Sequence, residues 1–376
     1  MKELYNPFVI GKYAGEHYFC DREIESNELI DNLLNSRNTV LVSERRLGKT
    51  GLICHCLGQK NIAKNYNIFS FDIYATNSFQ EFVYVFSKEI TKKLKPKGKK
   101  IIEKFLNIFT SLRGNFKIDA NTGEPSFELS IGDIVSPETT LDEIFSYIDN
   151  SEKPCIVAID EFQQIGKYSE SNVEALLRTK IQHCPNCTFI FAGSEKDMLI
   201  NMFNSAAKPF YQSATFMQLD KIDFEKYKTF AIGLFEENKK NISEDFVKLA
   251  YSKADGVTLY IQMIMNELYS ITPKNGCVTQ ELFDMSFDTL LKKQSFMYVN
   301  ILSDISIRQK ELLFAIAKEG RATEFTSGNF IKKYNLKSAS SSQASLKGLI
   351  DRRLVNKDKD CYLISDRLFR WWLLTL

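Results

Sequence analysis

The residues best able to do chemistry lie in a short loop near the start of the chain. An apolar run, Val40–Val42, precedes this loop, and a helical pattern from Thr50 to about Gln59 follows it. Strand, loop and helix in this order are the context of a phosphate-binding (Walker A) loop, whose backbone N–H groups surround phosphate oxygens. We predict that nucleotide phosphates are bound by Ser43, Glu44, Arg45, Arg46, Leu47, Gly48, Lys49, Thr50 and Gly51.

Two side chains of this loop have defined roles in such a motif. Lys49 would reach the β- and γ-phosphates, and the Thr50 hydroxyl would bind Mg²⁺. The loop departs from the pattern G-x-x-x-x-G-K-[ST] at one position, because Ser43 stands where the first glycine belongs. Serine is tolerated there if its φ is negative, whereas a positive φ would add strain.

A second chemical element follows a later apolar run. Cys155–Ile159 reads as a buried strand, and Asp160 and Glu161 come directly after it. The carboxyl ends of parallel strands are where an open α/β sheet binds ligands. Asp160 would be the Walker B acid that holds Mg²⁺, directly or through water, and Glu161 would polarise the attacking water. The pair therefore predicts hydrolysis as well as binding, in preference to an exposed acidic pair without function.

Composition narrows the class of protein. The chain has 376 residues, enough for two or three domains, and its 49 basic residues nearly balance its 47 acidic ones. The net charge is therefore too small to create an electrostatic field that would indicate nucleic acid or a membrane as a partner. No apolar run is long enough to span a membrane, and no signal peptide is recognisable, so we expect a cytoplasmic protein.

The eight cysteines are scattered, as reduced core thiols usually are. A metal site is suggested at one place, His183–Cys187, where a C-x-x-C pair follows a histidine. This segment offers three donors without a second pair elsewhere, and it precedes an expected strand. An ordinary turn between a helix and a strand is therefore favoured over a zinc site.

Strand and helix patterns alternate over residues 1–219. Strands are expected at Val40–Val42, Ile68–Tyr74, Cys155–Ile159 and Thr188–Ala192, and helices between them include Phe79–Leu94, Leu141–Asp149 and Val173–His183. This alternation indicates an α/β fold with a doubly wound parallel sheet, the core of a P-loop NTPase. Two alternating segments around residues 121–125 predict a β-hairpin insertion near 112–133.

Two further domains are expected after the sheet. Residues 220–298 read as helices, with a break at 254–256. In residues 299–376, three helices precede a two-stranded wing, which is a winged helix-turn-helix arrangement. The expected elements are the helices Arg308–Glu319, Ser327–Tyr334 and Ser342–Arg353 and the wing Val355–Ile364.

These motifs together resemble a known family. Val42–Thr50 is similar to the G-P-R-R-x-G-K-T loop of archaeal-type and Bacteroidetes P-loop ATPases, which belong near the STAND and AAA+ branch of the ASCE NTPases. Four further segments also resemble this family, so the resemblance extends over nearly the whole chain. They are Tyr18–Glu23, Ile159–Gln163, Phe191–Ser194 and Ile364–Trp372, the last of which resembles a closing D-R-x-F-R-x-W segment.

The resemblance implies further roles. It makes residues 220–298 a helical lid and places the segment before the first helix beside the adenine, so Asp21 and Arg22 join the predicted nucleotide site. Ser194 occupies the sensor-1 position, where it would orient the attacking water or the γ-phosphate; a strand-end serine bonded to its own turn is the alternative. Arg45, Arg46 and Arg178 are candidates for an arginine finger, and none is assigned.

Two departures from the family pattern predict slow turnover. Ser43 replaces a glycine, and Gly256-Val257-Thr258 stands where related STAND lids carry Gly-x-Pro. A sensor-2 arginine is not recognisable either. We therefore expect an enzyme that binds ATP or ADP with Mg²⁺ and hydrolyses ATP slowly.

The sequence does not identify the binding partner of the winged helix. Basic residues outnumber the nearby acids Asp351, Asp358 and Asp360, so the domain could contact DNA phosphates, or it could be a solvated surface of a protein-interaction module. The basic residues are Lys332, Lys333, Lys337, Lys347, Arg352, Arg353, Lys357 and Lys359.

Three functions follow from these observations. The first, and the one favoured, is a slow ATPase that acts as a nucleotide-controlled conformational switch, with an unknown protein partner at the lid or winged helix. The second is an ATP-regulated DNA-binding protein, and the third is a scaffold that holds ADP with little turnover. The sequence does not give the oligomeric state or the pathway.

Overall fold

The computed structural model describes residues 4–93, 108–112, 116–118, 125–127 and 129–376, and it divides the chain into two compact units. The sheet unit comprises Tyr13–Asp220. The helical unit joins residues 4–12 to Lys221–Leu376. The chain therefore crosses between the units twice, after Lys12 and after Asp220.

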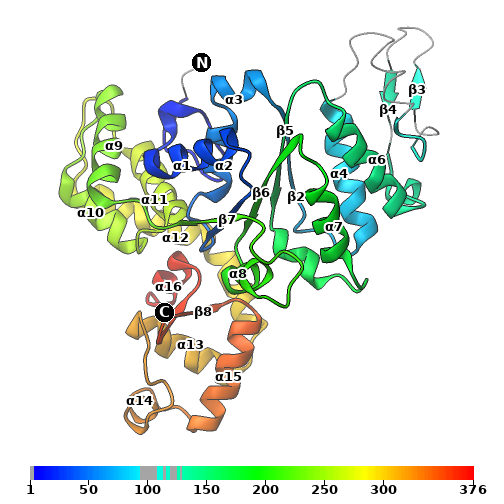
Figure 1. Ribbon diagram of the computed structural model, residues 1–376. Coiled ribbons are helices and arrows are strands. Elements are labelled where there is room, and N and C mark those ends of the chain that lie inside the picture. Colours follow the sequence, from blue (N-terminus) through cyan, green and yellow to red (C-terminus); the bar gives the residue numbers. More distant parts are fainter. Residues whose placement is uncertain (1–3, 94–107, 113–115, 119–124, 128) are drawn as a thin grey trace. The chain divides into compact units, whose positions relative to one another are not determined.

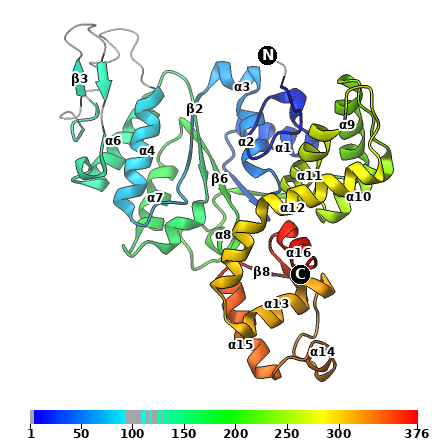
Figure 2. The same cartoon turned by 180° about the vertical axis from the view of Figure 1, so that it is seen from behind.

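The sheet unit is built on five parallel strands, shown from opposite sides in Figures 1 and 2. Their order across the sheet is β2-β5-β6-β1-β7, which confirms the predicted parallel α/β core. The strands are β1 (Thr39–Ser43), β2 (Asn67–Asp72), β5 (Cys155–Asp160), β6 (Cys187–Gly193) and β7 (Thr215–Leu219).

Four of these strands lie where the apolar runs predict them, and β7 was missed. All five residues of β1 are buried, as are the first five of β5, because helices cover both faces of a parallel sheet. In contrast, β7 is an edge strand in which Thr215, Phe216 and Gln218 are exposed. Its sequence therefore lacks the continuous apolar character that identifies the central strands.

Helices connect the strands, and their apolar side chains pack against the sheet to form the core. Helix α4 packs on β2 and on α6, and the buried rings of Phe162, Phe191, Phe203 and Phe210 contact one another at centroid distances of 4.5–5.9 Å. The helices are α1 (Glu23–Leu34), α2 (Lys49–Leu57), α3 (Lys60–Asn65), α4 (Phe79–Lys93), α6 (Pro137–Asp149), α7 (Val173–Gln182) and α8 (Lys196–Asn204), with short 3₁₀ helices η1 (Glu16–Tyr18), η3 (Ile131–Asp133) and η4 (Phe162–Lys167).

A short antiparallel pair lies within the segment expected to form a hairpin. Strand β3 (Phe116–Ile118) pairs with β4 (Pro125–Phe127), and Phe116 is opposite Phe127. The predicted turn, residues 121–124, lies outside the described residues.

The helical unit begins with four helices and ends with the winged helix. Helix α12 continues toward the winged helix as one long element (Figure 2). The elements are α9 (Phe224–Glu237), α10 (Glu244–Lys253), α11 (Thr258–Ile271), α12 (Gln280–Ser303), α13 (Ile307–Glu319), α14 (Gly328–Lys333), α15 (Ala339–Asp351), β8 (Val355–Asp358), β9 (Cys361–Ile364) and α16 (Arg367–Leu373). Helix α15 begins before the expected Ser342 because the Ser338 hydroxyl caps it by accepting from the Ser341 N–H.

The closing segment of the chain has a structural role that the sequence did not reveal. Asp366 caps α16 by accepting from the N–H groups of Leu368 and Phe369. Arg367 is almost fully buried, and its guanidinium lies 3.1 Å from Asp255, at the predicted break between α10 and α11. The Trp371 indole donates to the Lys253 carbonyl at 2.8 Å. The D-R-x-F-R-x-W segment therefore joins the winged helix to the preceding helices.

Residues 4–12 pack on the helical unit, although the sequence placed them with the sheet. The Asn6 amide donates to the Asn266 carbonyl at 2.8 Å, and the Asn266 amide donates to the Phe8 carbonyl at 2.7 Å. Phe8 is fully buried against Phe235 and Tyr269. In the described part of the chain, no helix combines the length and apolar character needed to cross a bilayer.

Candidate functional site

Three parallel strands end at one edge of the sheet and bring the predicted chemical groups together. Strand β1 leads into the loop of residues 44–48, β5 ends at Asp160, and β6 ends at Gly193 just before Ser194. Strand β6 lies between the other two and pairs with both. The loop, the acidic pair and Ser194 consequently meet at the carboxyl edge of the sheet.

The conformation of the loop explains how serine replaces the first glycine. Ser43 is the last residue of β1, pairs with Leu219, and does not have a positive φ. Its hydroxyl donates to the Glu44 carbonyl at 2.9 Å. The positive φ values of the loop fall instead at Arg46 (71°) and Gly48 (95°). Serine therefore adds no backbone strain at position 43.

Lys49 and Thr50 open helix α2 and face the acids of β5. The buried Lys49 ammonium lies 2.9 Å from Asp160 Oδ1 and 3.4 Å from Glu161 Oε1. The Thr50 hydroxyl donates to Asp160 Oδ2 at 2.7 Å. A hydroxyl and a carboxylate are hard oxygen donors of the kind that Mg²⁺ prefers, so Thr50 and Asp160 would hold this ion. The donor set thus fits the predicted ion.

Glu161 is the centre of a hydrogen-bond network. Its Oε2 accepts from the Ser194 hydroxyl at 2.8 Å and from the Gln163 amide at 2.5 Å. Arg45 Nε in turn donates to Ser194 Oγ at 3.2 Å, so this candidate arginine is part of the network. Ser194 therefore bonds to the acid of a neighbouring strand end rather than to its own turn.

Comparison with known proteins identifies the family. The model for an ATPase domain found predominantly in Archaea matches residues 19–264, and the model for a probable winged helix domain matches residues 296–375. The chain belongs to this archaeal-type ATPase family. Membership supports ATP binding. None of the curated proteins matches the chain.

Solved structures show the same fold at low sequence identity. The Walker-type ATPase PABY2304 of Pyrococcus abyssi is 20% identical with a TM-score of 0.67, and the alignment covers 98% of this chain and 99% of that one. The ORC2 protein of Aeropyrum pernix, solved as ADPNP-ADP complexes, is 12% identical with a TM-score of 0.60 over 98% and 97% of the two chains. The A. pernix ORC1 protein in complex with DNA is 11% identical, with a TM-score of 0.51 over 95% and 92%.

The segment before α1 contacts the backbone of the phosphate-binding loop. Arg22 is buried, and its guanidinium donates to the Leu47 carbonyl at 3.2 Å and pairs with Glu25 at 2.9 Å. Asp21 and Arg22 both have positive φ, 37° and 112°. Arg22 therefore contacts the backbone of the loop at Leu47. The sequence analysis expected Arg22 to contact the nucleotide and did not predict this bond.

An aromatic cluster beside α2 was missed by the sequence analysis. The Phe19 ring stacks on His55 at a centroid distance of 4.3 Å, and the Tyr13 hydroxyl lies 3.1 Å from His55 Nδ1. Burial lowers the pKa of His55, with a smaller opposing effect from Glu16. A Cβ added to Gly51 would lie 3.7 Å from Phe19, so the cluster adjoins the first turn of α2.

Asp72 is a further acid that the sequence did not single out. It ends β2 directly opposite Asp160 in the strand register, and it accepts from the Tyr74 N–H at 2.6 Å. Partial burial raises the pKa of Asp72, and the nearby charges of Asp160 and Glu161 raise it further. The sequence analysis missed this acid because the expected strand, Ile68–Tyr74, extended past Asp72, whereas β2 ends at it.

Arg178 and the cysteines of the His183–Cys187 segment have other contacts. Arg178 donates to Gln182 on its own helix α7 at 3.0 Å. Cys184 and Cys187 are free thiols, and Cys187 is opposite Cys155 in the sheet. Burial raises the pKa of Cys187 well above its usual value. In the part of the chain that the structure describes, no group of three His, Cys, Asp or Glu side chains could hold a metal ion.

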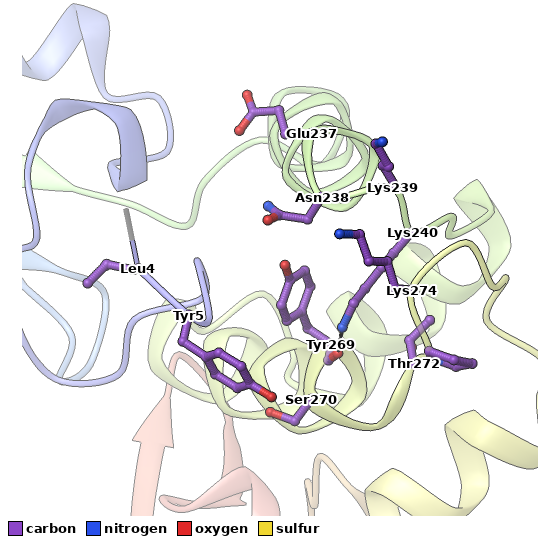
Figure 3. Close-up of a pocket in the computed structure, with 11 residues that line it drawn as sticks. Leu4, Tyr5, Glu237, Asn238, Lys239, Lys240, Tyr269, Ser270, Thr272 and Lys274 are labelled. Atoms are coloured by element: carbon purple, nitrogen blue, oxygen red, sulfur yellow. Dashed lines mark hydrogen bonds between the residues drawn. The ribbon is translucent and has the colours of Figure 1, made fainter. Parts of the chain in front are cut away.

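The helical unit of the ATPase contains a separate cavity of about 830 Å³, drawn in Figure 3. Lysines 239, 240 and 274 surround it together with Tyr269. The Lys240 ammonium already donates to the Tyr269 carbonyl at 2.6 Å and lies 3.9 Å from the centre of the Tyr269 ring. Burial also lowers the pKa of Lys240. This lysine is therefore engaged within the protein, and the cavity is not assigned to nucleotide.

Proposed function

We propose that this protein is a Mg²⁺-dependent ATPase that turns over slowly and acts as a nucleotide-controlled conformational switch. The observation that carries the proposal is the meeting of Lys49, Thr50, Asp160, Glu161 and Ser194 at one edge of the sheet. Family membership supports ATP as the nucleotide.

Each side chain has a role in this proposal. Lys49 binds the β- and γ-phosphates, and Thr50 and Asp160 would hold Mg²⁺, which neutralises charge on the transferring phosphoryl group when bound. Glu161 takes the proton of the attacking water, and Ser194 orients that water. The backbone N–H groups of residues 44–50 bind phosphate oxygens, and Arg22 holds that loop in place through the Leu47 carbonyl.

Slow turnover is supported by the contacts that nucleotide must replace. Lys49 is buried and paired with both acids, and Glu161 accepts two further hydrogen bonds. The Lys49 ammonium must leave these carboxylates and contact the phosphates when nucleotide binds to the loop. Buried ion pairs are costly to separate without a replacement partner. We propose that this exchange couples nucleotide binding to a change of state.

The two-unit architecture supports the role of a switch. Each unit has its own core, and the chain passes between them at two places. We propose that residues 220–298 form a lid and residues 299–376 a winged helix, and that nucleotide state controls their position. Inter-unit rearrangement is a common response of enzymes to nucleotide.

DNA binding is the second proposal and has weaker support. Lys333 is paired with Glu319 at 2.6 Å, which reduces the positive field of the winged helix. Arg352 and Arg353 are exposed at the end of α15. If they contact phosphates, alanine at both positions will weaken duplex binding and reduce its salt dependence. A flat titration of the wild-type protein with duplex at low salt removes this alternative.

The Lys49→Ala substitution tests the main proposal. It removes the cation that would contact the β- and γ-phosphates, so ATP affinity should fall about 10- to 150-fold, the effect of losing a hydrogen bond to a charged group. Binding of a fluorescent ATP analogue and release of phosphate measure the effect, each with Mg²⁺ and with EDTA. Chelation should also stop phosphate release by the wild type.

Lys180→Ala is the matched control, because Lys180 pairs with Asp142 on the surface of the same unit. Surface ion pairs contribute little, so this variant should bind and hydrolyse ATP normally. Wild-type affinity and turnover in Lys49→Ala would contradict the proposal. The nucleotide that co-purifies, identified after denaturation, separates a switch from an ADP-holding scaffold: bound ADP without any turnover supports the scaffold.

A further inference from the structure

Gln163 is a buried amide that points at the predicted catalytic acid. It lies in η4, two residues after Glu161, and only 1% of its surface is exposed. Its Nε2 donates to Glu161 Oε2 at 2.5 Å. The Ser194 hydroxyl donates to the same oxygen at 2.8 Å. Oε2 of Glu161 thus has two donors, whereas Oε1 faces the Lys49 ammonium at 3.4 Å.

The other end of this amide is unusual. Gln163 Oε1 is buried and has no hydrogen-bond partner among the described residues. An unsatisfied buried carbonyl costs free energy, so something must fix the amide in this orientation. The reversed orientation would place Oε1 against the Glu161 carboxylate, where two acceptors would repel each other. The bond to Glu161 therefore determines which way the amide points.

Gly193 makes room for this arrangement. A Cβ added to Gly193 would collide with Gln163 Oε1 and lie 3.1 Å from Gln163 Cδ. Gly193 has no positive φ, so glycine is required here by space and not by backbone conformation. The residue that precedes Ser194 therefore accommodates the amide that holds Glu161.

The backbone beneath Gln163 is held firmly. Phe162 and Ile165, on either side of it, are buried in the core of the sheet unit. Glu161, by contrast, has φ of 57°, a left-handed conformation that non-glycine residues adopt at a cost. A rigid donor beside a strained residue can fix its side chain.

We propose that Gln163 is a positioning residue that, with Ser194, holds Oε2 of Glu161 and leaves Oε1 as the oxygen that receives the proton of the attacking water. This inference rests on the proposed function, because it requires Glu161 to act as the base. An amide suits the task because it is uncharged: it orients the carboxylate without forming a competing ion pair. Lys49, which now faces Oε1, would move to the phosphates when ATP binds.

The test compares two neighbouring glutamines. Gln163→Leu keeps the bulk of the side chain and removes the donor, so kcat should fall about 10- to 100-fold, while affinity for a fluorescent ATP analogue changes less than about twofold. Gln164→Leu is the matched control, because this amide bonds to Thr76 and not to Glu161. It should keep the wild-type kcat. Gly193→Ala should reproduce the kcat loss of Gln163→Leu by displacing the amide.

A double-mutant cycle distinguishes positioning from general damage. If Gln163 acts through Glu161, adding Gln163→Leu to Glu161→Gln should lower the residual single-turnover rate no further. Equal additional loss in that background would overturn the inference, as would wild-type kcat in Gln163→Leu while Glu161→Gln is inactive. Failure of the proposed function looks different, because Glu161→Gln would then hydrolyse ATP as fast as the wild type. Circular dichroism melts of all variants ensure that folded proteins are compared.

Discussion

Glu161→Gln is expected to stop ATP hydrolysis and to leave ATP bound. The amide keeps the size of the side chain but cannot accept a proton, and general-base catalysis contributes about 10²–10⁴ in rate. ATP affinity should remain near that of the wild type, because Lys49, Thr50 and the loop N–H groups are unchanged. Removing a negative charge beside Lys49 also favours phosphate binding.

Single-turnover phosphate release measures the loss, and quantifying nucleotide in the denatured protein shows what the variant retains. The expected result is bound ATP in Glu161→Gln and bound ADP in the wild type. Asp72→Asn is the informative companion, because Asp72 lies opposite Asp160 at the next strand end. Loss of turnover in Asp72→Asn with normal turnover in Glu161→Gln would assign the base to β2 and contradict the role given to Glu161.

Much of the site could be predicted because it follows from strand ends. The apolar runs before Ser43, Asp160 and Gly193 identify central strands, and parallel strands necessarily collect their following residues at one edge. Local sequence carries that information. Strand ends therefore predict that Lys49, Thr50, Asp160 and Glu161 lie together, and the family resemblance adds Ser194 to them.

Residues that act across the fold could not be predicted in the same way. Gln163 follows the acidic pair, but only the packing of β6 beside β5 places Gly193 under its amide. The contact of Arg22 with Leu47 spans two segments of the chain. Strand β7 was missed for a related reason, since an edge strand needs fewer apolar residues than a central one. These features depend on neighbours that sequence spacing does not specify.

The helical unit illustrates the same difference. The winged helix was recognisable from its helices and wing, because each has a local pattern. The closing segment is recognisable from the sequence only as a family resemblance, yet its Arg367 and Trp371 join the winged helix to residues 253–255. Residues 4–12 likewise contact a helix more than two hundred residues away along the chain. Long-range contacts of this kind have no signature in a single sequence.

The largest expected effect on stability is at the centre of the aromatic core. Phe191 is fully buried on β6 and contacts Phe162, Phe189, Phe203 and Phe210 at centroid distances of 4.5–5.9 Å. Truncating such a ring to alanine removes its contacts and leaves a cavity, at a cost of about 3–5 kcal/mol. For a unit of this size, Tm should fall by about 6–20 °C.

Phe216→Ala is the control for this effect, because Phe216 lies on β7 of the same sheet and its side chain is 38% exposed. Its removal should cost clearly less, because the Phe216 ring is already partly exposed and meets the cluster edge-on at Phe203, at a centroid distance of 6.4 Å. Thermal melts followed by circular dichroism measure both variants. If Phe191→Ala melts no lower than Phe216→Ala, the cluster does not stabilise the sheet. If it does melt lower, ATP hydrolysis should fail with it on warming, because Phe162 of the same cluster supports the turn that carries Glu161 and Gln163.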